Sequence, residues 1–369
     1  MKICTIAFRS IHTQKYLQWL VKRGHEVHWI SENPEAIDGV EIWDIRKAAA
    51  YFSFSSRLRR AGKQIGRVIY IRKALKQIRP DIFHLHTLYY PSFLGVFTGY
   101  HPLVISPWNG DVLWSKKRPH YHRFIVKQAL KKADALTADN DIMKKGLLDY
   151  GVSGKKINTI LWYGVDSKLF RPKERDENLR SKLKITNGPV VLSMRSLEPG
   201  YNIDKIIRSI PLVTGKYPNV TYLFGWQSGQ LEHEYRSLAS ELGVEERVRF
   251  IGEVPYEEIP NYYSIADISL SVASPDSTPA TLLESMACGV PIIVSAEKAI
   301  TEFVKDGING DVVAEIEPMV IAEKISKLLA DHERKERYAV YNRKLVMQIA
   351  DLDTEMQKLE NIYQSLLKE

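Results

Sequence analysis

Short apolar segments alternate with amphipathic segments along most of the chain. Residues 2–8 are mostly apolar and residues 25–30 are half apolar, and between them residues 12–23 repeat apolar positions at helical spacing. Strands of this kind are typical of a parallel sheet that is covered by helices on both faces. The pattern therefore predicts an α/β fold, with strands at residues 2–8, 25–30, 81–85, 103–106, 135–138, 189–194, 220–225, 248–251, 268–272 and 291–294.

The pattern is interrupted by a polar stretch at residues 173–187 and then begins again. With 369 residues the chain is also longer than a typical single domain, so two successive α/β domains are expected. Helices are predicted at residues 12–23, 57–78, 120–133, 140–150, 202–216, 231–242, 256–265 and 281–287. The segment 318–367 is helical, with interruptions near His332 and Asp351.

Charge is distributed unevenly between the two halves. Residues 1–165 carry 27 lysines and arginines against 12 acidic residues, whereas residues 166–369 carry 25 against 32. A basic half joined to an acidic half predicts two different surfaces with two different ligands. No aromatic and basic RNA-binding module is present, so no nucleic-acid partner is predicted.

The most basic segment lies between Arg57 and Arg79, with nine cations, no acid, and apolar residues interleaved at helical spacing. Such a helix can bury one face on the sheet and offer the other to an anionic membrane surface. Trp114 and residues 116–118 could extend this basic patch. A soluble anionic acceptor, or a solvated helix face without a partner, would also fit the pattern.

Cysteine content and hydropathy point to the cytoplasm. Cys4 and Cys288 are predicted to be buried thiols, which suits a reducing compartment. No apolar run approaches the ~18–20 residues that span a bilayer, and Met1 leads directly into a strand without a signal peptide. We expect a cytoplasmic protein that can bind peripherally to the inner face of the membrane.

Residues 274–296, SPDSTPATLLESMACGVPIIVSA, combine a turn-rich loop, a short helix and a buried strand. The loop leads directly into the helix N-terminus, where free backbone N–H groups and the helix dipole suit a phosphate. Asp276 precedes the helix and Glu284 lies inside it. This arrangement predicts a site for a diphosphate with carboxylates beside it for sugar hydroxyls. In the alternative interpretation, Glu284 only complements a helix dipole and residues 289–291 form an ordinary turn.

This segment resembles the signature of the retaining glycosyltransferases of family four, whose pattern is E-x7-E followed by a small residue and C/Q-G-x-P. Here Asp276 stands for the first glutamate, Glu284 is the second, and SMACGVPI follows. The segments 162–172, 225–229 and 250–254 resemble other family motifs in the correct order. The resemblance implies the GT-B fold, with two Rossmann-like domains facing a central cleft and a C-terminal helix crossing back to the N-terminal domain. It divides the chain into an acceptor-binding domain (1–172), a nucleotide-sugar-binding domain (173–345) and a helix that packs back on the first domain (346–369).

The resemblance also assigns donor-site roles. Arg195, at a strand end, would bind the donor phosphates; an ion pair with Glu198 is the alternative. Gly200, Tyr201 and Asn202 stand where the family has a second cation, a lysine. The catalytic set implied is Arg195, Glu284, Asp111 and Asp276, and the donor-binding set is Asn202, Gly225, Trp226, Glu253, Val254, Ser277, Thr278, Pro279, Ala280, Thr281 and Leu282. Trp226 could stack on a sugar or base, or could simply pack.

The acceptor side is assigned in the first domain. Residues 81–86, DIFHLH, resemble the D-x-x-H-x-H strand end of the family, and His84 and His86 share one face of the strand. His84 is expected to be a core histidine and His86 to lie at the mouth of the cleft; a metal pair is less favoured because no third ligand is near. Many members have a histidine where this chain has Trp108, so polar groups of the following turn would serve instead. The acceptor-side set is Ser10, His12, His86, Trp108 and Asn109, with Asp111 beside it.

The function implied by the resemblance is a retaining hexosyltransferase, which moves a sugar from a nucleotide diphosphate sugar to a glycan or lipid-linked acceptor. In the other major glycosyltransferase fold, a D-x-D motif holds a metal ion and the diphosphate. No motif of that kind is found here, so a metal-independent reaction without a cofactor is predicted. Two alternatives stay open. A nucleotide-sugar epimerase of the same fold would convert the donor without an acceptor. A non-catalytic sugar-nucleotide-binding protein would bind the donor without transfer, as the missing lysine and histidine suggest.

Overall fold

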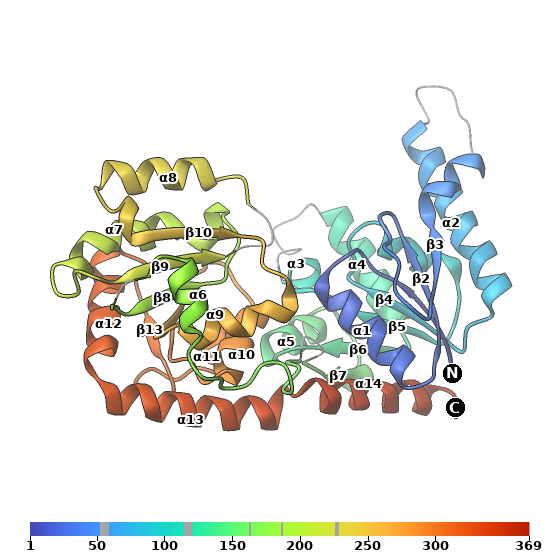
Figure 1. Ribbon diagram of the computed structural model, residues 1–369. Coiled ribbons are helices and arrows are strands. Elements are labelled where there is room, and N and C mark those ends of the chain that lie inside the picture. The colour runs from blue at the N-terminus through green and yellow to red at the C-terminus, as the bar shows by residue number, and fades with distance from the viewer. Residues whose placement is uncertain (52–58, 114–119, 162–163, 186, 226–228, 369) are drawn as a thin grey trace. The chain divides into compact units, whose positions relative to one another are not determined.

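The computed structural model describes residues 1–51, 59–113, 120–161, 164–185, 187–225 and 229–368 (Figure 1). The chain divides into two compact units, of which the first comprises Met1–Trp162 with Thr354–Glu369 and the second comprises Tyr163–Asp353. The end of the chain therefore returns to the first unit, which confirms the expected return of the C-terminal helix. The functional domain limits after residues 172 and 345 stay predictions.

The first unit is built on a seven-stranded sheet in which all neighbouring strands pair in parallel. Its order is β3-β2-β1-β4-β5-β6-β7. The central strands are buried on both faces because helices cover both, which explains their apolar runs. The strands are β1 (Lys2–Ile6), β2 (Glu26–Ser31), β3 (Val40–Asp44), β4 (Ile82–His86), β5 (Leu103–Ser106), β6 (Ala135–Ala138) and β7 (Ile157–Thr159).

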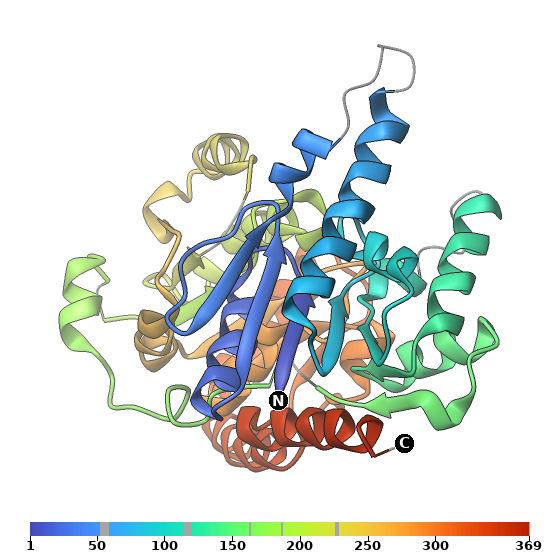
Figure 2. The ribbon, with the colours of Figure 1, turned by 90° about the vertical axis from the view of Figure 1, so that its right-hand side faces the viewer.

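Two helices of the first unit, α1 and α5, begin at polar caps where the chain leaves the sheet. Ser10 accepts a hydrogen bond from the backbone N–H of Thr13, and Asn140 accepts one from that of Met143. The α-helices are α1 (Ile11–Lys22), α2 (Arg59–Ile78), α3 (Asn109–Val112), α4 (His120–Lys132), α5 (Asp141–Asp149) and α14 (Leu352–Leu366). The 3-10 helices are η1 (Ile45–Tyr51), η2 (Ser92–Thr98) and η4 (Gly154–Lys156). Both α2 and α4 contact η2 (Figure 2).

A buried polar network joins α14 to the sheet of the first unit. The Nδ1 atom of His84 lies 2.6 Å from the hydroxyl of Tyr363 and 3.2 Å from that of Tyr16, and these two hydroxyls are 2.9 Å apart. Its Nε2 atom lies 2.8 Å from the hydroxyl of Ser106. His84 is thus a satisfied core histidine, as expected from its place inside the strand.

A second set of polar contacts joins α14 to the segment between α1 and β2. Glu360, although buried, pairs with Arg23 at 3.0 Å and with His25 at 2.9 Å. Buried carboxylates are stable only when they are paired and hydrogen-bonded. The last helix is therefore an integral part of the first unit.

The buried histidines predict acid sensitivity of the fold. Burial lowers the pKa of His84 well below its usual value of 6.5 and that of His86 to about 3. Between pH 6.5 and pH 3 the unfolded chain binds protons that the folded chain excludes. The free energy of unfolding is therefore highest above pH 6.5 and falls by about 1.4 kcal/mol per pH unit for each histidine as the pH drops.

Urea unfolding of the wild type and of His86→Gln between pH 7 and pH 4.5 measures this effect. Glutamine takes up no proton, so the dependence of stability on pH is expected to be less steep in the variant. The control is His332→Gln, at an exposed histidine of the second unit. A pH dependence that is the same in the wild type and in His86→Gln would contradict the prediction.

The second unit contains a six-stranded parallel sheet with the order β10-β9-β8-β11-β12-β13. Its strands are β8 (Val190–Ser193), β9 (Thr221–Gly225), β10 (Val248–Gly252), β11 (Ile268–Ser271), β12 (Ile292–Ser295) and β13 (Asp311–Val313). The α-helices are α6 (Glu177–Lys182), α7 (Ile203–Thr214), α8 (Glu232–Glu241), α9 (Ile259–Ile265), α10 (Ala280–Ala287), α11 (Lys298–Thr301), α12 (Pro318–Ala330) and α13 (His332–Ile349). The 3-10 helices are η5 (Pro199–Tyr201), η6 (Glu245–Arg247) and η7 (Tyr256–Glu258).

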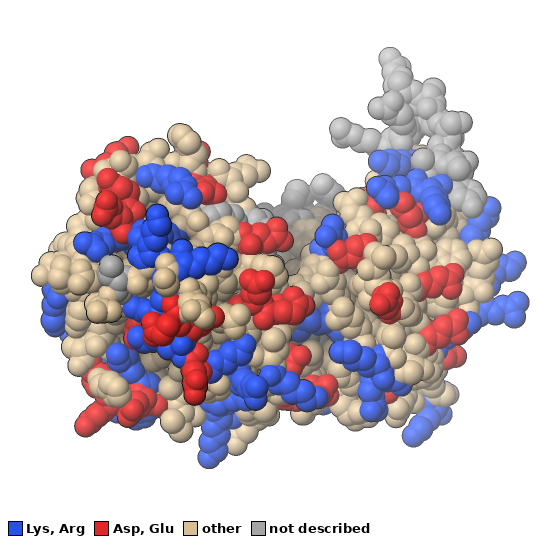
Figure 3. All heavy atoms as spheres, in the orientation of Figure 1, with Lys and Arg blue, Asp and Glu red and all other residues tan. Residues whose placement is uncertain are grey.

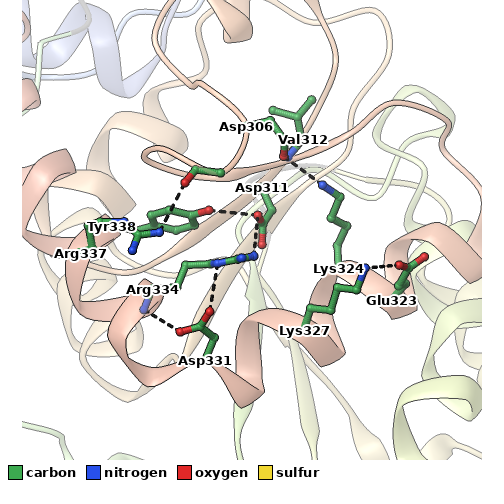
Figure 4. A network of polar contacts seen from close by, with 11 residues as sticks. Asp306, Asp311, Val312, Glu323, Lys324, Lys327, Asp331, Arg334, Arg337 and Tyr338 are labelled. Atoms are coloured by element: carbon green, nitrogen blue, oxygen red, sulfur yellow. Dashed lines mark hydrogen bonds and ion pairs between the residues drawn. The ribbon is translucent and has the colours of Figure 1, made fainter.

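The edge strand β13 is held by polar side chains of the helices beside it (Figure 4). The hydroxyl of Tyr338 donates to the buried carboxylate of Asp311 at 3.1 Å, and Arg334 lies 3.6 Å from the same oxygen. Asp331 caps α13 by accepting from the backbone N–H of Arg334. Burial raises the pKa of Asp311 although the hydrogen bond from Tyr338 lowers it. This edge of the sheet therefore depends on hydrogen bonds as well as on apolar packing.

Candidate functional site

The strand order of the second unit defines where a ligand can bind. From β8 the chain proceeds outward in one direction through β9 and β10, and from β11 it proceeds in the other through β12 and β13. In such sheets, ligands bind outside the carboxyl ends of the two strands at which the order reverses. Here these strands are β8, which is followed by Arg195, and β11, which is followed by the loop 272–279.

Arg195 lies at this point with only 8% of its surface exposed. Its Nη2 atom donates to Oδ2 of Asp276 at 2.7 Å and its Nη1 atom donates to the hydroxyl of Thr281 at 3.3 Å. The guanidinium also stacks on the ring of Tyr201, 4.4 Å from the ring centre. The carboxylate partner of Arg195 is thus Asp276, from the signature loop.

Several buried polar atoms around Arg195 lack a hydrogen-bond partner within the described part of the chain. They are the Nε atom of Arg195 and the hydroxyls of Ser193, Ser271 and Thr278. Each of these side chains is more than nine-tenths buried. Because buried polar groups are normally satisfied, this cluster favours a polar ligand at the ends of β8 and β11.

The N-terminus of α10 lies beside Arg195. The helix begins at Ala280 after Pro279, and the hydroxyl of Thr281 in its first turn already contacts the guanidinium. The positive end of the helix dipole and the cation of Arg195 act on the same position, which suits an anion. Leu282, by contrast, is buried in the core, so its side chain has a packing role.

Glu284 lies one turn further along α10 and is only 4% exposed. Its carboxylate is hydrogen-bonded to the hydroxyl of Tyr256. The pKa of the Tyr256 phenol is raised, mainly by burial and secondly by the negative charge of Glu284. The hydroxyl of Tyr263 donates to the carbonyl of Thr281 at 3.0 Å. Two tyrosines of η7 and α9 therefore hold Glu284 and the helix that carries it.

Other predicted donor residues have structural tasks in this unit. Asn202 adopts φ 52° and its amide donates to the carbonyl of Val272 at 2.8 Å, which joins η5 to the loop after β11. A Cβ atom at Gly225 would lie 2.6 Å from Sδ of Met194, so a larger residue there would have to displace the end of that side chain. Val254 is buried and Glu253 is exposed. Trp226 lies outside the described residues.

The first unit has its own point of reversal, between β1 and β4. Ser10 follows β1 and caps α1, and the half-buried His12 lies in the first turn of that helix. The ring centre of Trp108, which follows β5, is 6.4 Å from that of His12. His86 ends β4 and is fully buried, with its ring 4.3 Å from that of Tyr16. These acceptor-side residues gather at the carboxyl edge of the sheet.

Asp111, predicted as a catalytic group, is 3% exposed and holds two loops together. Its Oδ2 atom accepts from the backbone N–H groups of Leu88 and Trp108 at 2.7 and 2.8 Å and from the hydroxyl of Thr87 at 2.9 Å. Thr87 has φ 78°, a left-handed conformation that is strained for this residue type. Asp111 thus stabilises the strained loop after β4, and direct action on a substrate stays a prediction. The side chain of Asn109 lies outside the described residues.

The site contains two residues that the sequence reasoning assigned no role. Tyr201 supports Arg195 by stacking, and Tyr256 bonds to Glu284. Tyr201 stands beside the position where the family has its lysine, and an aromatic residue close to an arginine is a usable signal for stacking. Tyr256 carries no such signal, because 28 residues separate it from Glu284 in the chain. Among the described residues no group of three or more His, Cys, Asp or Glu side chains could hold a metal ion.

Two family models match the chain. The model for glycosyl transferases group 1 matches residues 174–345, and the model for glycosyl transferase 4-like proteins matches residues 2–140. The alpha-monoglucosyldiacylglycerol synthase of Streptococcus pneumoniae is 25% identical over 312 residues, which cover 79% of this chain and 68% of that protein. The GDP-mannose-dependent alpha-(1-6)-phosphatidylinositol monomannoside mannosyltransferase of Mycolicibacterium smegmatis is 30% identical over 191 residues, which cover 49% of each protein. With several curated relatives the match spans about half of the relative's length.

Solved structures share the fold over the whole chain. The Anabaena protein Alr3699/HepE, in complex with UDP and glucose, superimposes with a TM-score of 0.81 and 18% identity, covering 99% of this chain and all of that one. WaaG, a glycosyltransferase involved in lipopolysaccharide biosynthesis, gives a TM-score of 0.75 with 15% identity, covering 98% of this chain and 99% of that one. At these identities the likeness establishes the fold alone.

Proposed function

Because the chain belongs to the glycosyl transferases group 1 family, the retaining GT-B enzymes of family four, we propose that it moves a hexosyl unit from a nucleotide diphosphate sugar to a glycan or lipid-linked acceptor. The observation that carries this proposal is the buried guanidinium of Arg195 beside the N-terminus of α10 at the reversal point of the second sheet. A buried cation and a helix N-terminus together suit a diphosphate.

In the proposed reaction, the residues of the second unit act on the donor. Arg195 and the first turn of α10 stabilise the negative charge that grows on the departing diphosphate, where a buried setting strengthens their effect. Glu284, held by Tyr256, accepts hydrogen bonds from hydroxyls of the ribose or the sugar. The departing phosphate oxygen takes the acceptor proton on the same face of the sugar, which retains the anomeric configuration. No metal ion takes part in this scheme.

The first unit is proposed to bind the acceptor at the carboxyl edge of its sheet, near His12 and Trp108. An aromatic surface with polar neighbours suits a sugar ring, which presents both apolar and hydroxyl faces. The Streptococcus relative is named for monoglucosyldiacylglycerol, in which a sugar is joined to a lipid. This name supports a lipid-linked acceptor for this chain.

A thermal-shift screen of nucleoside diphosphates and nucleotide sugars tests the proposed donor. A ligand at about 100 times its dissociation constant stabilises the folded protein by ~2.7 kcal/mol, which is easily measured. The donor found in this way is then incubated with and without candidate acceptors, and the products are separated by chromatography. Conversion of the donor without an acceptor would indicate an epimerase. Binding without any turnover would indicate a non-catalytic protein.

A membrane surface is the second proposed partner, and α4 carries the best surface for it. Phe124 is 62% exposed and Ile125 is 39% exposed, next to the exposed cations Arg123 and Lys127. A hollow of about 260 Å³ lies among these side chains, lined by His120, Arg123, Phe124, Lys127, Asp149 and Tyr150. Exposed apolar side chains between cations are typical of surfaces that bind anionic bilayers from one side. Among the described residues, no helix is long and apolar enough to cross the bilayer.

The predicted basic helix contributes only part of its charge to such a surface. Arg67 is buried, where it pairs with Glu32 and stacks on Tyr90, and Arg72 donates to the carbonyl of Phe97. The exposed cations of α2 are Lys63, Arg72, Lys73 and Lys76, and basic side chains lie along this edge of the first unit (Figure 3). Arg57, Trp114 and residues 116–118 lie outside the described residues, as do the side chains of Arg59 and Arg60.

Co-sedimentation with vesicles tests the membrane proposal. Binding is expected to require anionic lipid, to weaken with salt, and to fall by about tenfold or more when Arg123 and Lys127 become glutamate, since each cation contributes about 1 kcal/mol. A matched control with the same charge change replaces Lys182 and Lys344 on the second unit, which are both exposed. Equal recovery in the supernatant with neutral and anionic vesicles at low salt would exclude the membrane as a partner.

A further inference from the structure

The guanidinium that would bind the donor is already engaged by an acid of the same chain. Oδ2 of Asp276 lies 2.7 Å from Nη2 of Arg195, and its Oδ1 atom accepts from the backbone N–H of Ser277 at 2.8 Å. The side chains of Arg195 and Asp276 are only 9% and 13% exposed. This is a short, buried ion pair between the end of β8 and the loop that precedes α10.

The contacts of Arg195 bring any second anion close to Asp276. Asp276 and Thr281 each accept from one N–H group, at Nη2 and Nη1, and Tyr201 covers one face of the guanidinium. The Nε atom lacks a hydrogen-bond partner among the described residues, and each Nη atom has a second N–H group. Arginine binds phosphate most strongly through two parallel N–H groups, and both such pairs of this side chain include Nη2. A diphosphate on either pair would therefore lie against the nitrogen that Asp276 already contacts.

The surroundings of this ion pair supply no second cation and add a negative charge, so a phosphate group would depend on Arg195. Gly200, Tyr201 and Asn202 supply no second cation, and Glu297 adds another negative charge that acts on Asp276. Burial raises the pKa of Asp276 although Arg195 lowers it, so the attraction of Arg195 does not fully offset the cost of burying the carboxylate. The ion pair is therefore one that a stronger anion can displace.

We propose that Asp276 competes with the diphosphate of the donor for Arg195 and so sets the affinity of the enzyme for nucleoside diphosphates. This inference rests on the proposed function and deepens it. When a diphosphate takes the fork, the carboxylate of Asp276 leaves Arg195 and becomes an acceptor for hydroxyls of the sugar. Because a nucleoside diphosphate product offers no such hydroxyls, Asp276 weakens the binding of the product more than that of the donor.

Isothermal titration with UDP, GDP, ADP and TDP tests the competition in the wild type and in Asp276→Asn. The amide carries no charge, so the dissociation constant of the diphosphate that binds is expected to fall by about tenfold, the effect of removing one charged competitor. Glu297→Gln is the matched control, because it removes a nearby negative charge that bonds to Ser274 at 2.6 Å rather than to Arg195. Its dissociation constant is expected to stay within about twofold of that of the wild type. A similar gain in both variants would overturn the proposal, since the effect would then be one of general charge.

A second measurement does not depend on the folding of a variant. A crystal structure of the wild type with the bound diphosphate is expected to show Arg195 on the phosphates and Asp276 turned away from it. An intact contact between Arg195 and Asp276 in that complex would overturn the proposal, as would equal or weaker binding by a folded Asp276→Asn protein. If no nucleoside diphosphate binds the wild type or either variant, the proposed function fails together with this inference. If one binds without a gain in Asp276→Asn, only the inference fails.

Discussion

Replacement of Arg195 by lysine is expected to lower kcat/KM by about 10- to 100-fold, a loss of ~1–3 kcal/mol in transition-state stabilisation. Lysine keeps the charge but loses the planar fork that here reaches both Asp276 and Thr281, and it loses much of the stacking on Tyr201. Steady-state kinetics with the identified donor and acceptor measure the effect. Equal activity of the lysine variant would show that only a diffuse positive charge matters at this position.

The chain offers a matched control for this substitution. Arg236 in α8 also stacks on an aromatic ring, 4.7 Å from the centre of Phe250, and also pairs with a carboxylate, that of Glu232. It does not lie at the point where the strand order reverses. Arg236→Lys is therefore expected to retain the activity of the wild type, and a comparable loss there would mean that the assay reports the stability of the second unit.

Replacement of Glu284 by alanine is expected to weaken transfer by roughly tenfold or more, the worth of one good hydrogen bond to a charged group. Glu284→Gln is expected to retain part of the activity, because an amide oxygen can still accept a hydrogen bond. Kinetics of both variants, combined with a thermal melt, separate this loss from unfolding. An unchanged kcat/KM in a folded Glu284→Ala protein would exclude a role in donor binding.

Tyr256→Phe separates the role of the Glu284 carboxylate from that of the tyrosine hydroxyl that holds it. This change removes the hydroxyl that bonds to Glu284 and leaves the carboxylate in place. If Glu284 binds the donor, the tyrosine variant is expected to lose less activity than Glu284→Ala and to lose it mainly through KM. If the pair serves only the packing of α10 against η7, both variants are expected to lower the melting temperature without a specific effect on donor binding.

The strands in the middle of both sheets were predictable because they are buried on both faces. Such strands are largely apolar, so residues 103–106 and 291–294 stand out in the sequence and agree with β5 and β12 within a residue. The breaks of the C-terminal helical segment at His332 and Asp351 were also correct, since polar residues mark the ends of α12 and α13. Local pattern was sufficient here because burial imposes it on each element separately.

The edge strands β3, β7 and β13 were missed for the converse reason, whereas the fourth edge strand, β10, was predicted. β3 has no fully buried residue and mixes polar with apolar residues, and β7 and β13 are only three residues long. None of them forms the apolar run that marks a central strand, so the neighbouring sheet alone defines them. The family, by contrast, was recognisable from the segment 276–292, because the signature combines a loop, a helix and a strand that are contiguous in the chain.

The sequence by itself therefore determined the α/β class, the two-unit organisation, the family, and the presence of Arg195, Asp276 and Glu284 among the candidate site residues. Only the tertiary structure decided what these side chains touch. Arg195 and Asp276 are 81 residues apart and meet because β8 and β11 are neighbours in the sheet. His84 meets Tyr363 across 279 residues because α14 belongs to the first unit. Local periodicity reports burial along one element, whereas contacts of this kind depend on the order in which distant strands pair, and no local pattern encodes that order.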